Sequence, residues 1–270
     1  MESTFTQTTF GSSGIKVNRL GLSATYRPGK KTVYRALDKG MNFFFCFGID
    51  GQLIRVLRDV FRTQREHLVV ATGAYNLVWG HPNLRRTLEK RLRQLGTDYI
   101  DVFLFLGVLK PKQFPDEVKE ELCRFRQEGK VRTIGISTHD RKFAGRLAEE
   151  GVLDALMIRY NAAHRGAEED IFPHLKVHDP GLISYTATRW TYLTRRSRKW
   201  AKDRPIPTAS QCYRFVLSNS DVDVCLTAPR NIKQLDENIT ALEDGPLSLD
   251  EMSFMREFGD VVHHTKKWFM

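Results

Sequence analysis

Eight short apolar runs, separated by helix-length amphipathic segments, constrain the fold of this chain more than any other feature of its sequence. The runs are residues 20–24, 42–46, 68–72, 100–106, 133–136, 155–160, 182–185 and 222–227. Runs of this length that alternate with amphipathic helices are typical of a parallel sheet built of βα units. Eight such units predict an α/β protein, a (β/α)8 TIM barrel, as one domain over residues 1–270. Residues 5–17 come first and predict a β-hairpin that turns between Gly11 and Gly14.

The segments between the runs carry physical signals for helices. A stripe of four leucines falls on one face at helical spacing, with basic residues on the other face. The stripe consists of Leu84, Leu88, Leu92 and Leu95. Thr208-Ala-Ser-Gln211 and Ser248-Leu-Asp-Glu251 fit the capping box, in which two side chains satisfy two free backbone N–H groups at the start of a helix. Residues 194–207 show no such periodicity, and we expect a mobile, solvated loop there.

Charge and cysteine content limit the classes of partner. Lys and Arg number 42 against 32 Asp and Glu, a formal charge of +10 that favours anionic ligands such as a phosphorylated cofactor. The most basic stretch, residues 195–204, holds one aromatic residue, Trp200, and no nucleic-acid-binding motif, so we expect no nucleic-acid partner.

The same composition bears on metals, membranes and compartment. The four cysteines lack metal-binding or disulfide spacing, and no apolar run approaches the length that crosses a bilayer. Residues 1–14 do not resemble a secretory signal. We therefore expect no metal, no membrane contact and a reduced, cytoplasmic location, and the oligomeric state stays open.

An ordered set of short motifs resembles the aldo/keto reductase family. The motifs are Gly14-Ile-Lys-Val17, Arg19-Leu-Gly21, Gly40-Met-Asn-Phe-Phe44, Thr97-Asp-Tyr-Ile-Asp101, Gly129-Lys-Val-Arg132, Ile134-Gly-Ile-Ser137, Arg159-Tyr-Asn161 and Gln234-Leu-Asp-Glu-Asn238. They follow the family's order and span most of the chain, from Phe10 to about Val262. The resemblance implies an NADP(H)-dependent oxidoreductase that acts on a carbonyl group or an alcohol of a small-molecule substrate.

The resemblance also implies four catalytic positions, which in the family hold Asp, Tyr, Lys and His. Here they fall on Phe45, Asp50, Gly73 and Leu106. In the family the Tyr protonates the alkoxide that hydride transfer leaves, and a cationic neighbour lowers its pKa from about 10. Phe, Gly and Leu cannot donate a proton, and Asp50 could do so only if burial kept it neutral. We expect ordinary carbonyl reduction to be very slow, and we expect Phe45, Gly73 and Leu106 at the barrel mouth with Asp50 at its rim.

The positions that bind the cofactor in the family are better preserved. By resemblance, Ser137 meets the nicotinamide carboxamide, Tyr185 stacks on the ring, and Thr186 lies beside the pyrophosphate. Two other carboxamide contacts are changed, because Thr138 and Met157 stand where the family has Asn and Gln.

The adenosine end of the cofactor maps onto the last apolar run and the segment after it. By resemblance, Arg230 meets the 2′-phosphate, and Gln234 and Asn238 lie near the adenine. Arg230 also precedes a predicted helix, whose N-terminus favours a phosphate. We predict NADP as the cofactor.

Other reactive side chains near the ends of the runs offer a relocated proton donor, because barrel active sites form there. Tyr75, two residues beyond Gly73, is the best candidate, and Asp50 is the second. The others are Cys46, Asn76, Ser137, His139, His164 and Arg165, the last two of which could pair with the acidic residues 168–170.

Three hypotheses from different classes follow. The first is a divergent NADP(H)-dependent reductase with a relocated or dispensable proton donor. The second is a pseudoenzyme that binds a nucleotide, or nothing, and acts as a sensor or scaffold. The third is a barrel with unrelated, non-redox chemistry in an apolar pocket formed by Phe45, Phe47, Trp79 and Leu106.

Overall fold

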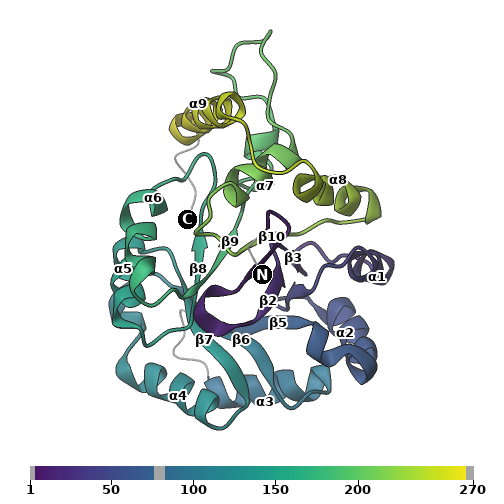
Figure 1. Ribbon diagram of the computed structural model, residues 1–270, viewed down its shortest axis with the longest axis vertical. Coiled ribbons are helices and arrows are strands. Elements are labelled where there is room, and N and C mark those ends of the chain that lie inside the picture. Colours follow the sequence, from purple (N-terminus) through teal and green to yellow (C-terminus); the bar gives the residue numbers. More distant parts are fainter. Residues whose placement is uncertain (1–3, 76–82, 266–270) are drawn as a thin grey trace.

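A closed barrel of eight parallel strands forms the centre of the computed structural model, which describes residues 4–75 and 83–265 (Figure 1). The strands are β3 (Leu20–Ser23), β4 (Phe43–Phe45), β5 (Val69–Tyr75), β6 (Ile100–Val108), β7 (Val131–Thr138), β8 (Ala155–Arg159), β9 (Gly181–Tyr185) and β10 (Val224–Thr227). Neighbours in this order pair in parallel, and β10 closes the ring on β3 with Cys225 opposite Leu20. Each predicted run overlaps one strand, so the predicted (β/α)8 fold is confirmed.

Helices surround the barrel (Figure 1). They are α1 (Lys30–Asp38), α2 (Gly51–Gln64), α3 (Leu84–Leu95), α4 (Asp116–Gln127), α5 (Arg141–Glu150), α6 (Ala167–Asp170), α7 (Ala209–Leu217), α8 (Ile232–Glu243) and α9 (Leu249–Thr265). Short 3₁₀ turns are η1 (Gly11–Ser13), η2 (Arg65–His67), η3 (Pro111–Gln113), η4 (Phe172–Val177) and η5 (Tyr192–Thr194). All four leucines of the predicted stripe are buried in α3. Both capping boxes form, because Thr208 Oγ1 accepts from the Gln211 amide at 3.1 Å and Ser248 Oγ from the Glu251 amide at 3.2 Å.

The predicted hairpin closes the N-terminal end of the barrel. Strands β1 (Gln7–Thr9) and β2 (Lys16–Asn18) pair antiparallel, and the hairpin crosses the centre of the barrel in Figure 1. Phe10 is buried in the cluster that fills the barrel, with its ring centroid 6.0 Å from that of Phe43 at the start of β4. Ligands therefore reach the barrel from the other end, where the strands terminate.

Side chains alternate along the strands between the barrel interior and the helix layer. On β6, Leu104 and Leu106 belong to the interior cluster, whereas Phe103 and Phe105 belong to the outer core. The Phe103 ring meets that of Phe125 on α4 edge to face, with centroids 5.8 Å apart. This alternation points Leu106 into the C-terminal mouth.

The basic segment of residues 194–207 is anchored to α9, in contrast to the solvated loop we expected. Trp200 is 5% exposed, its ring lies 5.0 Å from that of Phe258, and its indole N–H donates to the Pro205 carbonyl at 2.8 Å. Arg204 forms an ion pair with Glu257 of α9. The buried indole anchors the segment through an apolar contact that its basic composition did not predict. Arg198 and Lys199 remain exposed.

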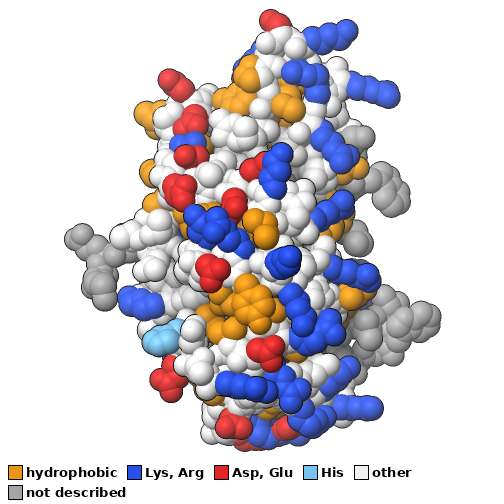
Figure 2. Space-filling model, turned by 90° about the vertical axis from the view of Figure 1, so that its right-hand side faces the viewer, with side chains coloured by type: hydrophobic (Ala, Val, Ile, Leu, Met, Phe, Trp, Pro, Cys, Tyr) orange, Lys and Arg blue, Asp and Glu red, His pale blue; other side chains and the backbone are white. Residues whose placement is uncertain are grey.

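Lys and Arg side chains are unevenly distributed over the surface. In Figure 2 they project along the right-hand edge of the visible face, whereas most of the Asp and Glu side chains on that face lie to the left of this edge. Within residues 4–75 and 83–265, no helix is long and apolar enough to span a membrane.

Candidate functional site

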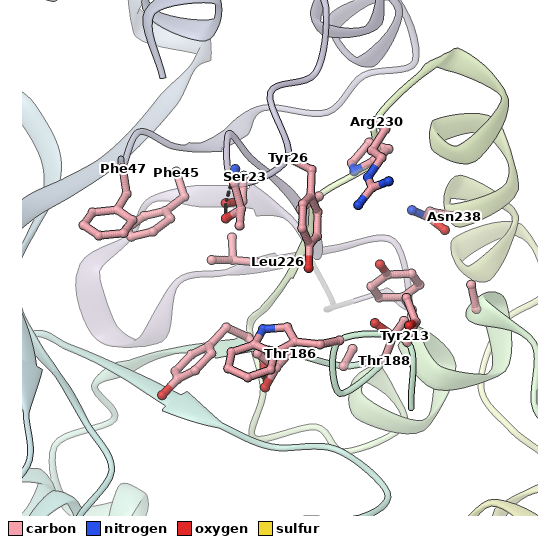
Figure 3. Close-up of a pocket in the computed structure, with 18 of the residues that line it drawn as sticks. Ser23, Tyr26, Phe45, Phe47, Thr186, Thr188, Tyr213, Leu226, Arg230 and Asn238 are labelled. Atoms are coloured by element: carbon pink, nitrogen blue, oxygen red, sulfur yellow. Dashed lines mark hydrogen bonds between the residues drawn. The ribbon is translucent and has the colours of Figure 1, made fainter. Parts of the chain in front are cut away.

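A cavity of about 860 Å³ opens at the C-terminal mouth of the barrel. This volume lies in the upper part of the range for ligand sites. Figure 3 shows Phe45 and Phe47 at one end of the cavity and Arg230 and Asn238 at the other. The cavity therefore has an apolar end beside β4 and a polar end beside α8.

All six residues predicted to bind the cofactor line this cavity. They are Ser137, Tyr185, Thr186, Arg230, Gln234 and Asn238. They come from β7, from β9 and the residue after it, from the residues after β10, and from α8. The fold thus gathers side chains that lie far apart in the sequence around one cavity.

Arg230 stands at the rim of the cavity. Its guanidinium lies over the ring of Tyr26, 5.2 Å from the centroid. The Arg230 amide donates to Gln234 Oε1 at 2.9 Å, and the Gln234 amide donates to Asn231 Oδ1 at 3.0 Å. Side chains of this protein already accept from these two amides, whereas the Arg230 guanidinium is exposed.

The wall near α8 contains a chain of hydrogen bonds. The Asn238 Nδ2 group donates to Thr227 Oγ1 at 2.8 Å, and that hydroxyl donates to the Tyr213 hydroxyl at 2.9 Å. Asn238 and Tyr213 line the cavity, and both are buried. Sequence reasoning missed Tyr213, because it lies inside an amphipathic helix and resembles a core residue.

Tyr185, Ser137 and His139 form a polar group at the floor of the cavity. The Tyr185 hydroxyl lies 3.4 Å from the ring nitrogens of His139, and the two rings meet edge to face. Burial raises the pKa of Tyr185 to about 12, although Arg159 and the hydrogen bond with Ser137 oppose the shift. Burial, assisted by Arg159, lowers the pKa of His139. Near neutral pH these two groups are therefore uncharged.

The four residues that stand at the family's catalytic positions do not all lie on the cavity. Phe45 and Leu106 line the cavity, and Gly73 lies in β5 opposite Leu104 of β6. Asp50 is not among the lining residues, because it is buried at the start of α2, where its carboxylate pairs with Arg91 of α3 at 2.9 Å. The structure thus does not bring Asp50 to the ligand side of the mouth.

Tyr75, the other candidate proton donor, does line the cavity. Its side chain is 46% exposed, and its ring stacks on that of Phe47 with centroids 5.7 Å apart. Tyr75 is therefore the candidate acid whose side chain can contact a ligand.

The other candidate reactive side chains are buried, are paired with another residue, or lie outside the described residues. Cys46 is buried, and burial raises the pKa of its thiol. Burial lowers the pKa of His164 to about 3. Arg165 pairs with Asp260 of α9 at 2.7 Å, not with the acidic residues 168–170 as we had considered. Asn76 and Trp79 lie outside the described residues. In the part of the chain that is described, no cluster of His, Cys, Asp and Glu could hold a metal ion.

The loop between β9 and η5 adopts a backbone that the sequence did not reveal. Its residues with positive φ are Thr186 (61°), Arg189 (47°), Trp190 (51°) and Thr191 (71°). This conformation is costly for residues other than glycine, and such strain concentrates at functional sites. Asn161 donates to the Thr186 carbonyl at 2.9 Å, and Arg189 donates to the Val262 carbonyl at 2.7 Å. These bonds hold Thr186, Trp190 and Thr191 against the cavity.

The sequence pattern of the aldo/keto reductase family matches residues 22–260. This chain belongs to the aldo/keto reductase family. Among curated relatives it is 25% identical to the NADH-specific methylglyoxal reductase of Escherichia coli, over 67% of this chain and 65% of that protein. It is 22% identical to the L-galactose dehydrogenase of Arabidopsis thaliana, over 87% of each chain. The holo form of an aldo-keto reductase from Bacillus halodurans has a similar fold, with a TM-score of 0.77, 20% identity, and 93% of this chain and 95% of that chain covered.

The side chains present fit the nicotinamide cofactors that aldo/keto reductases generally use. Tyr185 offers a ring for stacking, Ser137 a hydroxyl for an amide, and Arg230 a cation at the rim.

Proposed function

We propose that this protein is an NADP(H)-binding oxidoreductase of a small carbonyl compound, in which the family's cofactor wall is retained and its acid–base residues are replaced. One observation carries the proposal: six side chains from four separate parts of the chain line a single cavity and carry the chemistry that a phosphorylated dinucleotide needs. The bound cofactor would supply a hydride to the carbonyl carbon.

The residues of this chain would bind and orient that cofactor. Tyr185 would stack on the nicotinamide, Ser137 would bond its carboxamide, and Thr186 would lie beside the pyrophosphate. Arg230 would meet the 2′-phosphate, because a guanidinium binds phosphate through two parallel hydrogen bonds. Phe45 and Leu106, at two positions of the family's catalytic set, exclude water but donate no proton.

Calorimetric titration of NADPH and NADH tests the cofactor assignment. Charged hydrogen bonds contribute about 1.5–3 kcal/mol each, so Arg230→Ala should weaken NADPH binding roughly tenfold to a hundredfold and leave NADH binding nearly unchanged. Lys233→Ala is the matched control, because Lys233 is an exposed cation three residues further along, in the first turn of α8, that does not line the cavity. Equal weakening of both cofactors by Arg230→Ala would assign Arg230 a structural role, and the NADH in the name of the Escherichia coli relative makes this comparison necessary.

A second function, a nucleotide-binding pseudoenzyme, is favoured by the environment of Asp50. This carboxylate pairs with Arg91 and lies away from the cavity, so it offers no substitute for the missing acid. The two functions differ in one measurement. A reductase oxidises bound NADPH when a suitable carbonyl compound is added, whereas a pseudoenzyme binds NADPH tightly and leaves it reduced.

A further inference from the structure

Arg159, the last residue of β8, lies beside the floor of the large cavity. It is opposite Tyr185 in the parallel register of β8 and β9. Side chains alternate along a strand, and Ala155 and Met157 of β8 belong to the cluster that fills the barrel. Arg159 is therefore on the side of β8 that faces the barrel interior, next to the tyrosine on which a nicotinamide ring would stack.

A second, much smaller cavity places Arg159 next to His139. This cavity of about 10 Å³ has room for about one water molecule. Arg159 and His139 both line it, and His139 also lines the large cavity, which Arg159 does not. The ring nitrogens of His139 lie 3.4 Å from the Tyr185 hydroxyl. Arg159 therefore acts on the large cavity as a charge, across the side chains of His139 and Tyr185.

Positive charge gathers behind these two side chains. Arg141, the first residue of α5, lines the small cavity with Arg159, and Arg189 is buried nearby. Burial is the main cause that lowers the pKa of Arg159, and repulsion from Arg141 lowers it further. Burial and then repulsion from Arg159 lower the pKa of Arg189 in the same way. Asp170 pairs with Arg141 at 2.7 Å and offsets part of this charge.

The described residues at the floor of the large cavity include no carboxylate that could offset the remaining charge. Glu237 is the one carboxylate among the described lining residues, and it lies on α8, at the end where Arg230 stands. Tyr185 and His139 are uncharged near neutral pH. The floor of the cavity therefore has a positive electrostatic potential.

The two redox states of a nicotinamide cofactor differ in charge at the ring. The oxidised ring carries one positive charge, the reduced ring is neutral, and the phosphates of the two states are the same. A ring stacked on Tyr185 would lie roughly 8 Å from the Arg159 guanidinium, given the spacing of neighbouring strands and the thickness of a stacked ring. Two unit charges roughly 8 Å apart, at an effective dielectric constant of about 20, change a binding constant by roughly thirtyfold.

We propose that Arg159 makes this cavity select the reduced over the oxidised nicotinamide cofactor, an inference that rests on the cofactor assignment above for the place of the ring. Arg159 repels the oxidised ring and leaves the neutral, reduced ring unaffected. Arg230 cannot make this distinction, because the 2′-phosphate is present in both states. The two arginines therefore have separate roles, Arg230 toward the phosphate and Arg159 toward the redox state.

Calorimetric titration of NADPH and NADP⁺ measures this selectivity as the ratio of the two dissociation constants. The unmodified protein should bind NADPH roughly threefold or more tighter than NADP⁺. Arg159→Met removes the charge and keeps an unbranched side chain, so it should tighten NADP⁺ binding and lower the ratio by roughly threefold to thirtyfold. Arg159→Gln is a second neutral variant with the same expected effect, and Arg159→Lys keeps the charge and should keep most of the ratio. Equal binding of both cofactors by the unmodified protein, or an unchanged ratio in the neutral variants, would overturn the proposal.

Two further variants show whether the ratio reports the charge of Arg159. Arg165→Met removes a half-buried cation in the segment after β8 that pairs with Asp260 and lines neither cavity, so the ratio should stay unchanged. Arg230→Ala should weaken NADPH and NADP⁺ by the same factor. If Arg165→Met lowers the ratio as much as Arg159→Met does, the selectivity does not come from Arg159.

Titration of His139 in the protein without cofactor separates this proposal from the cofactor assignment. Burial, and after it Arg159, lowers the pKa of His139, so Arg159→Met should raise that pKa, which NMR of the imidazole measures. If the pKa rises but neither dinucleotide binds, the proposed function fails and the selectivity fails with it, while the positive potential at the floor stands. If both dinucleotides bind and the ratio does not respond to Arg159, the cofactor site stands and the selectivity proposal fails.

Discussion

Asp50 and Tyr75 differ in what each side chain contacts, and this decides which can act on a ligand. Asp50 is 6% exposed and pairs with Arg91 of α3, whereas Tyr75 is nearly half exposed within the cavity. A side chain must lie within hydrogen-bond reach of the atom it protonates. Tyr75 is therefore the only one of the two candidate acids that a cavity-bound ligand can meet.

Ordinary aldehydes provide a residue-scale prediction. We expect turnover of benzaldehyde with NADPH far below the 1–10³ per second typical of enzymes, because Phe45, Asp50, Gly73 and Leu106, at the family's four catalytic positions, bring no acid to the cavity. A steady-state assay of NADPH oxidation measures this directly. Turnover in the typical range would mean that a donor exists, and Tyr75→Phe, which keeps the ring and removes the hydroxyl, should then lower it by roughly a hundredfold or more.

At the scale of elements, the pairing of β5 with β6 determines what position 73 can hold. Gly73 lies opposite Leu104, and a Cβ atom on Gly73 would lie only 2.0 Å from the Leu104 carbonyl oxygen. A backbone oxygen in a central strand cannot rotate away as a side chain can. The strands must therefore separate before any side chain fits, and replacing Gly73 with the family's lysine does not simply restore a catalytic group.

The stability of Gly73→Ala checks this constraint. Overpacking against the backbone should lower the free energy of unfolding by about 1–3 kcal/mol or more. Gly51→Ala is the control, because Gly51 begins α2 with no atom within 4 Å of the added Cβ, and alanine favours the helix there. Chemical denaturation should find Gly51→Ala unchanged or more stable. A Gly73→Ala variant as stable as the control would mean that β5 and β6 adjust at little cost.

At the scale of the whole molecule, one carboxylate joins the hairpin to the barrel. Asp223 Oδ2 accepts from the Leu182 amide at 2.8 Å and from the Gly11 amide at 3.2 Å. These contacts link the hairpin turn, β9 and the residue before β10. Burial raises the pKa of Asp223 from 3.8 to about 7, although both amides and Arg19 oppose the shift.

The raised pKa of Asp223 predicts how the free energy of unfolding depends on pH. In the unfolded chain the carboxyl loses its proton near pH 4, whereas in the folded protein it keeps the proton until about pH 7. Between these values the folded state binds more protons, so this contribution to the free energy of unfolding falls as pH rises, by up to about 1.4 kcal/mol per pH unit. It is fully present below pH 4 and lost above pH 7.

Asp223→Asn tests whether Asp223 causes this pH dependence. The asparagine side chain keeps an oxygen that can accept from both amides but has no carboxyl group that titrates. Denaturation at pH 5 and pH 8 should show that the variant gains stability relative to the unmodified protein as pH rises. An unchanged difference between the two proteins at both pH values would mean that Asp223 does not carry this dependence.

Local sequence patterns predicted the barrel because burial of one face of a helix or strand, and capping of a helix, depend on residues close together in the sequence. Apolar runs and helical stripes mark the faces that must be buried, as for the leucines of α3, and the hydroxyl of Thr208 fixes a helix start through a bond three residues away. The sequence also located the ends of the strands, so the six residues predicted to bind the cofactor, from Ser137 to Asn238, line the same cavity.

Contacts between residues distant in the chain became known only from the tertiary structure. No local pattern says that Asp50 pairs with Arg91, or that Phe47 stacks on Tyr75. The segment from Thr186 to Thr191 holds no glycine, yet four of its residues adopt positive φ because Asn161 of the β8 end and Val262 of α9 hold the loop. Such contacts form when separate elements pack together, and packing overrides local preference wherever it buries enough surface to offset the strain.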